Sequence, residues 1–191
     1  MSPYSSDVDK RLNVYIIMWI ISAVFAFAIN YSANMLVKDF ELFVQFIVFI
    51  VSLSPMAICM LFIDRLPQSF LLKVSGIANL YGQYEGVLKT SHDGFSEEYP
   101  VQVTIRQTIR SMDISLSTKD SRSYNTSASI NIVNGRIVLL YTYCNKGSTE
   151  KSLNMHDGTC ELTFESNMVT GNYYTSHDRK NYGSIVMQRM D

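Results

Sequence analysis

Two long apolar segments fill most of the first third of this chain, at residues 12–29 and 42–63. Neither contains Asp, Glu, Lys, Arg or His, and each is about long enough to cross the ~30 Å hydrocarbon core of a membrane as a helix. A surface helix of a soluble protein keeps a polar stripe towards water, and neither segment has one. The pattern therefore predicts two transmembrane helices ahead of a soluble remainder.

Basic residues flank these two segments unevenly. Lys10 and Arg11 precede the first segment. Arg65 and Lys73 follow the second, whereas the loop between the segments carries only Lys38. Because positively charged flanks stay in the cytoplasm, we expect both termini to be cytoplasmic in a protein that crosses the membrane twice. A cleaved signal peptide is the alternative for the first segment, but its apolar run is longer than the hydrophobic region of such peptides.

Charge and cysteine content limit the partners of the soluble part. The formal net charge of the whole chain is −1, which provides no strong field for a DNA or RNA polymer, so any recognition of a nucleotide must be local. Cys59 lies in the second apolar segment, and Cys144 and Cys160 are expected on opposite faces of their strands. No disulfide framework is predicted, and this fits a reducing compartment.

From residue 80 onward the chain alternates apolar and polar side chains, as strands with one buried face do. Tight turns alternate with longer connections, and the pair Asn134 and Gly135 is typical of a type I′ hairpin. In an up-and-down meander, alternate connections lie at opposite ends, so one end should be tight and the other ringed by loops. We predict strands at residues 80–88, 99–107, 112–118, 125–133, 137–144, 159–165, 168–175 and 183–189.

The predicted fold class is a membrane-anchored all-β protein, with two N-terminal transmembrane helices followed by an eight-stranded up-and-down antiparallel β-barrel. Eight strands can close a barrel whose interior is filled or holds one small ligand, although an open sandwich is the alternative. We divide the chain into a two-helix transmembrane anchor, residues 1–73, and a cytoplasmic ligand-binding β-barrel, residues 74–191. The segment 119–124 is expected to be one of the long loops.

Strand parity predicts which side chains face the interior at each end of the barrel. At the loop-ringed end, the inward-facing strand positions and the loop that follows the strand 168–175 bring together polar, aromatic and basic side chains. These candidate ligand-binding residues are Thr126, Tyr143, Asn145, Tyr173, Thr175, His177 and Arg179. Gly82, Tyr84 and Arg189 are expected at the tight end, and we interpret them as a structural plug of the barrel rather than a ligand-binding site.

Short motifs connect this pattern to known families. The Gly82-Gln83-Tyr84 segment with Arg189 resembles lipocalin-like calycin barrels, in which the Arg packs across the aromatic ring at the closed end. The two-helix prefix, the segments 81–86 (YGQYEG), 140–145 (LYTYCN), 156–159 (HDGT) and 171–175 (GNYYT), and the terminal Gly-x-Ile-x-Met-x-Arg follow one another in order. This layout is similar to the SMODS-associating two-TM, β-strand-rich effectors of the bacterial CBASS antiphage system, the CD-NTase-associated protein 15 family.

The resemblance implies a function for both halves of the chain. In that family the barrel is a receptor for a cyclic dinucleotide made by a partner CD-NTase nucleotidyltransferase, and binding drives homo-oligomerisation that breaches the bacterial inner membrane. Tyr, Asn, Thr and Arg side chains suit such a ligand, because they stack on bases, pair with base edges and bind phosphates. The alternative function is a membrane-tethered, lipocalin-like carrier of a fatty acid or another apolar ligand, which would need a roomy apolar cavity.

The remaining motifs carry less chemistry. Ser22 and Ala26 form a small-xxx-small pair, and Gln45 could bond across helices, so these three are candidates for assembly within the lipid bilayer. We find no phosphate-binding Gly-rich loop, nucleophile elbow or carboxylate pair, and the three His residues lack ligand spacing. We therefore expect no enzymatic activity, no metal and no cofactor beyond the ligand itself.

Overall fold

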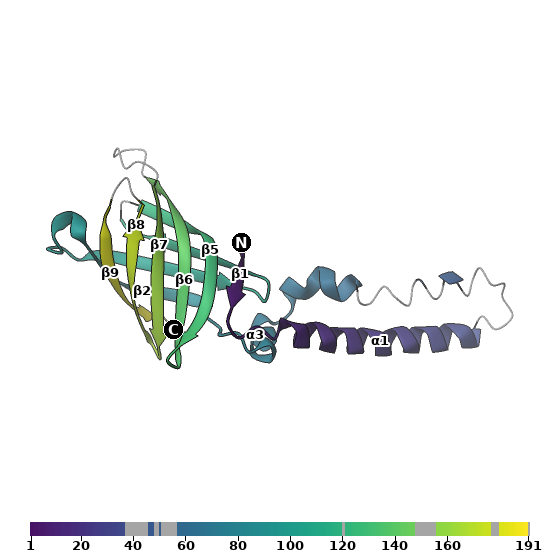
Figure 1. Ribbon diagram of the computed structural model, residues 1–191. Coiled ribbons are helices and arrows are strands. Elements are labelled where there is room, and N and C mark those ends of the chain that lie inside the picture. The colour runs from purple at the N-terminus through teal and green to yellow at the C-terminus, as the bar shows by residue number, and fades with distance from the viewer. Residues whose placement is uncertain are drawn as a thin grey trace. The chain divides into compact units, whose positions relative to one another are not determined.

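The computed structural model describes residues 1–36, 46–47, 50, 57–119, 121–147, 156–176 and 180–190. The chain forms two compact units, one made of Met1–Asp9 with Gly76–Asp191 and the other of Lys10–Ser75 (Figure 1). The sequence-based division placed the first nine residues with the helices, whereas the structure places them with the strands.

The Lys10–Ser75 unit is helical in its described part. It contains α1 (Arg11–Leu36), the short η1 (Ile63–Arg65) and α3 (Gln68–Ser75). Within the described residues, α1 is the one helix that is long and apolar enough to cross a membrane, judged by length and composition. Of the second predicted transmembrane helix, residues 57–62 are helical, and most of the remainder lies outside the described residues.

One face of α1 is buried within its own unit. Val14, Met18 and Ser22 recur at four-residue spacing and are all nearly inaccessible, and Ala26 continues the row half-buried. The Ser22 hydroxyl donates a hydrogen bond to the Cys59 sulfur at 3.8 Å. Ser22 therefore contacts the second apolar segment of the same chain. Gln45 lies outside the described residues, and the role of Ser22, Ala26 and Gln45 in assembly stays a prediction.

The described residues of the other unit form nine strands, which close into a ring (Figure 1). The order around the ring is β1-β4-β3-β2-β9-β8-β7-β6-β5, with an additional β4–β5 pairing. The bounds are β1 (Ser2–Ser6), β2 (Gly82–Thr90), β3 (Tyr99–Gln107), β4 (Ser111–Ser117), β5 (Ser121–Val133), β6 (Arg136–Gly147), β7 (His156–Glu165), β8 (Met168–Thr175) and β9 (Tyr182–Arg189).

Strands β2 to β9 are the predicted antiparallel meander, in which every consecutive pair is bonded and β9 returns to pair with β2. The ninth strand, β1, was not predicted. It lies between β4 and β5, antiparallel to the first and parallel to the second. Its sequence, SPYSS, offers one large apolar side chain and a proline, so no alternation was visible.

The two ends of the ring differ as expected from the turns. Tight connections join β3 to β4, β5 to β6 and β7 to β8, and the β5–β6 turn has positive φ at Asn134 and Gly135. The other end carries the longer connections, except at 119–124, where the expected long loop is wrong. There β5 already begins at Ser121, whose carbonyl oxygen accepts a hydrogen bond from the Thr118 backbone N–H at 2.9 Å. The polar run at the start of β5 resembles a loop because one of its faces is exposed.

Candidate functional site

At the tight end of the ring interior, polar side-chain groups bond to backbone carbonyl oxygens of the chain. The buried Tyr84 hydroxyl donates to the Leu80 carbonyl oxygen at 2.9 Å, and its ring meets Phe164 edge-on at 5.7 Å between centroids. Arg189, which pairs with Tyr84 in register, donates to the Tyr81 carbonyl oxygen at 2.7 Å. A Cβ at Gly82 would lie 3.1 Å from the Arg189 Nε. The structure thus brings Gly82, Tyr84 and Arg189 together at the tight end, with Tyr84 buried and Arg189 exposed, and the role of the three as a plug stays a prediction.

The loop end of the ring interior is lined by a different set of residues, which we call the mouth cluster. Its members come from strands β2 and β5 to β8, face the interior and carry hydroxyl, amide or imidazole groups. They are Thr90, Ser123, Asn125, Tyr143, Asn145, His156 and Tyr173. Register links them in rows, because Asn145 pairs with Ser123 on one side and with His156 on the other, and Tyr143 pairs with Asn125.

Tyr143 lies against a glycine of the neighbouring strand. A Cβ at its register partner, Gly158, would lie 2.4 Å from both the Cζ and the hydroxyl of Tyr143, so only glycine leaves room for this ring. The Tyr143 ring also meets the rings of His156 and Tyr141 at 6.4 and 6.3 Å between centroids. Tyr143 is therefore a buried aromatic wall of the mouth cluster.

Tyr173 repeats this arrangement on the next pair of strands. A Cβ at its partner Gly183 would lie 2.4 Å from the Tyr173 Cε1. Burial raises the pKa of the Tyr173 hydroxyl above its ordinary value, while a hydrogen bond with Thr90 acts in the opposite direction. Tyr173 is thus a neutral hydroxyl group at physiological pH, able to donate one hydrogen bond and to accept others.

Asn145 carries a polar atom whose hydrogen bond is missing. The side-chain Oδ1 is buried, and within the described part of the chain it has no hydrogen-bond partner. Such an acceptor costs roughly 1–3 kcal/mol when it is left unsatisfied. A donor supplied from outside the protein, such as the edge of a nucleobase, would recover this free energy. Asn145 is therefore the strongest indication of a ligand in the mouth cluster.

The prediction that Thr126 faces the interior is wrong. The register of β5 with β6 shifts between Asn125 and Ser127, which makes Thr126 the extra residue of a β-bulge. Thr126 is exposed, and its hydroxyl lies 2.7 Å from that of Thr142 on the outer face. Beyond the bulge the parity is reversed, so Ser123 and Asn125, only 4% and 8% exposed, take the inward positions.

Of the three remaining candidates of the predicted site, the structure describes Thr175 alone. Thr175 closes the turn that follows β8, because its hydroxyl accepts from the Asn181 N–H at 2.8 Å and donates to the Asn181 carbonyl oxygen at 3.0 Å. It is half-buried at the rim of the mouth cluster. His177 and Arg179 lie outside the described residues, and their role stays a prediction.

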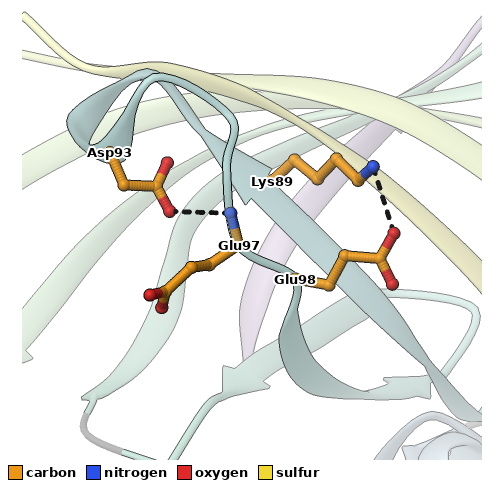
Figure 2. A network of polar contacts seen from close by, with 4 residues as sticks. All are labelled: Lys89, Asp93, Glu97 and Glu98. Carbon is orange, nitrogen blue, oxygen red and sulfur yellow. Dashed lines mark hydrogen bonds and ion pairs between the residues drawn. The ribbon is translucent and has the colours of Figure 1, made fainter.

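The β2–β3 connection at this end is held by its own charges. Figure 2 shows the Lys89 ammonium paired with the Glu98 carboxylate at 3.0 Å, and the Glu97 N–H donating to the Asp93 carboxylate at 3.2 Å. The Tyr99 hydroxyl donates to the same Asp93 carboxylate at 3.1 Å. Lys89 is therefore engaged with an acid of its own loop.

Other chemistry in the described residues is limited. No group of three or more His, Cys, Asp or Glu side chains that could hold a metal is found among them. Cys160 is buried beside Tyr141, and this burial raises the pKa of its thiol to about 12. Such a thiol stays protonated at neutral pH and is a poor nucleophile.

Sequence reasoning missed six residues that shape the mouth cluster: Thr90, Ser123, Asn125, His156, Gly158 and Gly183. A bulge hides the parity of Ser123 and Asn125, because nothing in a single sequence marks the inserted residue. The glycines did carry a signal, since a glycine inside a strand often marks the close approach of a neighbouring group.

Comparisons with known proteins connect this geometry to a family. Residues 75–189 match the family described as "Cap15, cyclic dinucleotide receptor domain", a segment that includes strands β2 to β9 but neither β1 nor α1. CD-NTase-associated protein 15 of Staphylococcus schleiferi is 33% identical over 100 residues, which are 51% of this chain and 54% of that relative. The chain spans about half the length of this curated relative. Because the family match covers more than half of the chain, the resemblance is confirmed, and the chain belongs to the Cap15 family of cyclic dinucleotide receptor domains.

Proposed function

We propose that this chain is a cyclic-dinucleotide-gated effector of CBASS antiphage defence. Its ligand binds at the mouth cluster and is made by a partner CD-NTase. Binding brings the apolar helices of several copies together in the bacterial inner membrane, which then leaks, and the infected cell dies. The observation that carries the proposal is the buried Oδ1 of Asn145, which has no partner among the described residues and lies on the same strand as Tyr143, in a domain of the Cap15 family.

The chemistry of the mouth cluster suits the bases of such a ligand. Tyr143 and Tyr173 offer aromatic surfaces on two different strand pairs, and bases stack on aromatic rings. Asn145 offers an acceptor for an exocyclic amine of a base, while the Tyr173 hydroxyl offers a donor. The phosphates require cations, and we assign this role to His177 and Arg179 in the β8–β9 connection.

The path of the chain supports a two-pass topology. β1 precedes the apolar region in sequence, yet it pairs with β4 and β5, which follow that region. Strands of one ring must lie on the same side of a membrane, so the chain between them must cross an even number of times. Helix α1 provides one crossing, and we assign the return crossing to residues 42–63. The basic flanks then place both termini and the ring in the cytoplasm, where the ligand is made.

The filled interior argues against the carrier function. Tyr84, Tyr141 and Leu162 are nearly inaccessible to solvent, and they occupy the space that an acyl chain would need. We also expect no catalysis, because the sequence has no phosphate-binding Gly-rich loop, nucleophile elbow or carboxylate pair.

The test of the proposed function is the entry of a membrane-impermeant dye into cells that produce the full chain and a cyclic dinucleotide synthase. We expect dye entry only when both are present, and we expect Asn145→Ala to reduce it at equal protein abundance. Dye entry that is independent of the synthase would contradict ligand gating.

A second test addresses topology. A reporter fused after Asp191 should be active only in its cytoplasmic form, whereas one inserted near Lys38 should be active only in its periplasmic form. The reverse pattern would place the ring in the periplasm, away from the ligand, and the proposed function would fail.

A further inference from the structure

Strands β4 and β5 separate partway along their length and form a fork. Their backbones pair over three residue pairs, the last of which joins Ser115 to Tyr124. The side chain of Asn125 then continues the ladder, since its Oδ1 accepts from the Ile114 N–H at 2.8 Å and its Nδ2 donates to the Met112 carbonyl oxygen at 3.4 Å. The register gives β4 and β5 no further pairing beyond this point. A strand-wide gap in the ring follows.

The N-terminal strand β1 fills the fork (Figure 1). It pairs with β4 through Ser2 and Pro3, and with β5 through Tyr4, Ser5 and Ser6. The pairing with β5 is parallel, unlike the other pairings of the described ring. β1 precedes the helical unit in the sequence and is not part of the up-and-down meander. Its direction relative to β5 is therefore not fixed by a hairpin connection.

A single side chain anchors β1 in a polar socket. Tyr4 is 6% exposed, and its hydroxyl donates to the Thr108 carbonyl oxygen at 3.1 Å while it accepts from the Gln107 Nε2 at 3.2 Å. Gln107 is itself buried and fixed, because its Oε1 accepts from the Leu80 N–H at 2.7 Å. The socket is therefore built by residues of the ring and is specific for a phenolic side chain.

A carboxylate holds the other end of the segment. The backbone N–H of Asp7 donates to the Ile130 carbonyl oxygen at 3.0 Å, and its Oδ2 accepts from the Ile132 N–H at 3.1 Å. The fork thus recognises a short strand with a tyrosine followed three residues later by an aspartate. Both recognition residues lie within the first nine residues of the chain.

We infer that the fork is a strand-accepting surface and that, in the assembled protein, it takes the N-terminal strand of a second copy of this chain. The contacts above involve only Met1–Asp9 and the ring, and β1 is joined to β2 only through the whole Lys10–Ser75 unit. A strand from another copy would make the same contacts, so the exchange conserves them and is favoured by a high local concentration of copies. The inference rests on the proposed assembly and assigns a partner surface to it.

The test uses two full-length chains with different affinity tags, produced together in one membrane. One chain carries Ser5→Cys and the other Ser129→Cys, because these two residues are register partners in the β1–β5 pair. A short cross-linker that joins two thiols is then added, with and without a panel of cyclic dinucleotides. The matched control replaces Ser129→Cys with Ser184→Cys, a residue of β9 that pairs with β2 and β8. The single variants report the background from the native cysteines.

We expect a cross-linked pair of differently tagged chains, several-fold above the Ser184→Cys control, in at least one of the conditions. A chain that carries both Ser5→Cys and Ser129→Cys reports strand pairing within one copy. If this double variant cross-links but the mixed chains stay at the control level in every condition, strand exchange is wrong. Dye entry measured in the same cells separates the two proposals, because leakage without cross-linking leaves the proposed function intact and refutes the exchange.

Discussion

The two ends of the ring interior are built from similar residues and yet differ in their polar atoms. At the tight end, the Tyr84 hydroxyl and the Arg189 guanidinium find carbonyl oxygens of the chain at 2.9 and 2.7 Å. At the loop end, Tyr173 bonds to Thr90, but the Asn145 Oδ1 is buried without a partner among the described residues. The tight end is complete by itself, whereas the loop end can still gain a hydrogen bond.

We therefore expect the bonded groups of the tight end to contribute to stability, and the unsatisfied acceptor of the loop end to contribute to ligand binding. A fully satisfied cluster contributes to the free energy of unfolding, and its loss is felt whether or not a ligand is present. An unsatisfied acceptor weakens the unliganded protein and favours the bound state. Mutations that remove a bonded group should therefore destabilise the unliganded protein, whereas removal of the Asn145 acceptor should not.

The largest effect is expected at the tight end. Tyr84→Ala should lower the free energy of unfolding by about 3–5 kcal/mol, because it removes a buried aromatic ring and leaves a cavity beside Phe164. The exposed Tyr81→Ala is the matched control and should change it by less than about 0.5 kcal/mol. Denaturant unfolding of the full chain in detergent measures both. Equal effects would show that the Tyr84 ring is not packed in the interior at the tight end.

A smaller loss is expected where a glycine of β7 makes room for the mouth cluster. Gly158→Ala should destabilise the protein by about 1–3 kcal/mol, because the new Cβ would meet the Tyr143 ring and the Tyr174 carbonyl oxygen, both at 2.4 Å. Thr159→Ala, one residue further along β7, serves as the control. If Gly158→Ala is as stable as the unmodified chain, the close approach of Tyr143 to β7 is wrong.

The two asparagines of the mouth cluster should respond in opposite directions. Asn125→Ala breaks the bond that Ile114 donates and should cost about 1–3 kcal/mol. Asn145→Ala removes an acceptor that has no partner, so it should be neutral or stabilising by up to about 1 kcal/mol without ligand. Thermal unfolding of both variants compares them directly. A loss at Asn145 as large as that at Asn125 would mean that its Oδ1 is already satisfied.

A small loss is expected for Tyr173→Phe, which removes the hydrogen bond with Thr90 and should cost about 0.5–1.5 kcal/mol at neutral pH. The pKa of Tyr173 is raised in the folded state, so its contribution is complete below pH 10, the ordinary value, and is lost as the pH rises through the folded-state pKa. The phenylalanine variant should therefore lose less stability above pH 10 than the unmodified chain. Parallel melting curves against pH would contradict the assignment.

Much of the ring could be predicted from the sequence, because each strand of the meander alternates apolar and polar residues along one buried face. β3 and β8 begin and end at the predicted residues, and the Asn134–Gly135 turn has the expected positive φ. β1 could not be predicted, since a five-residue strand with one buried side chain has no period to detect. Its place is decided by the fork, which forms only when the ring is assembled.

The site was less predictable than the fold. Parity placed Tyr143, Asn145 and Tyr173 at the loop end, where the structure also has them. Parity failed at Thr126 because one bulged residue reverses the facing of every residue before it in β5. The hydrogen bonds of Asn125 and the empty acceptor of Asn145 depend on neighbours from other strands. Such contacts are properties of the folded ring and not of any single segment.

The central claim is that the mouth cluster binds a cyclic dinucleotide, and calorimetric titration of the full chain in detergent tests it most directly. We expect at least one cyclic dinucleotide of a panel to bind, and we expect Asn145→Ala to weaken that binding by about 5- to 100-fold, the equivalent of roughly 1–3 kcal/mol for one lost hydrogen bond. Ser184→Ala, on strand β9, should bind as the unmodified chain does. Equal affinity of the Asn145→Ala variant, or no binding of any cyclic dinucleotide, would contradict the account.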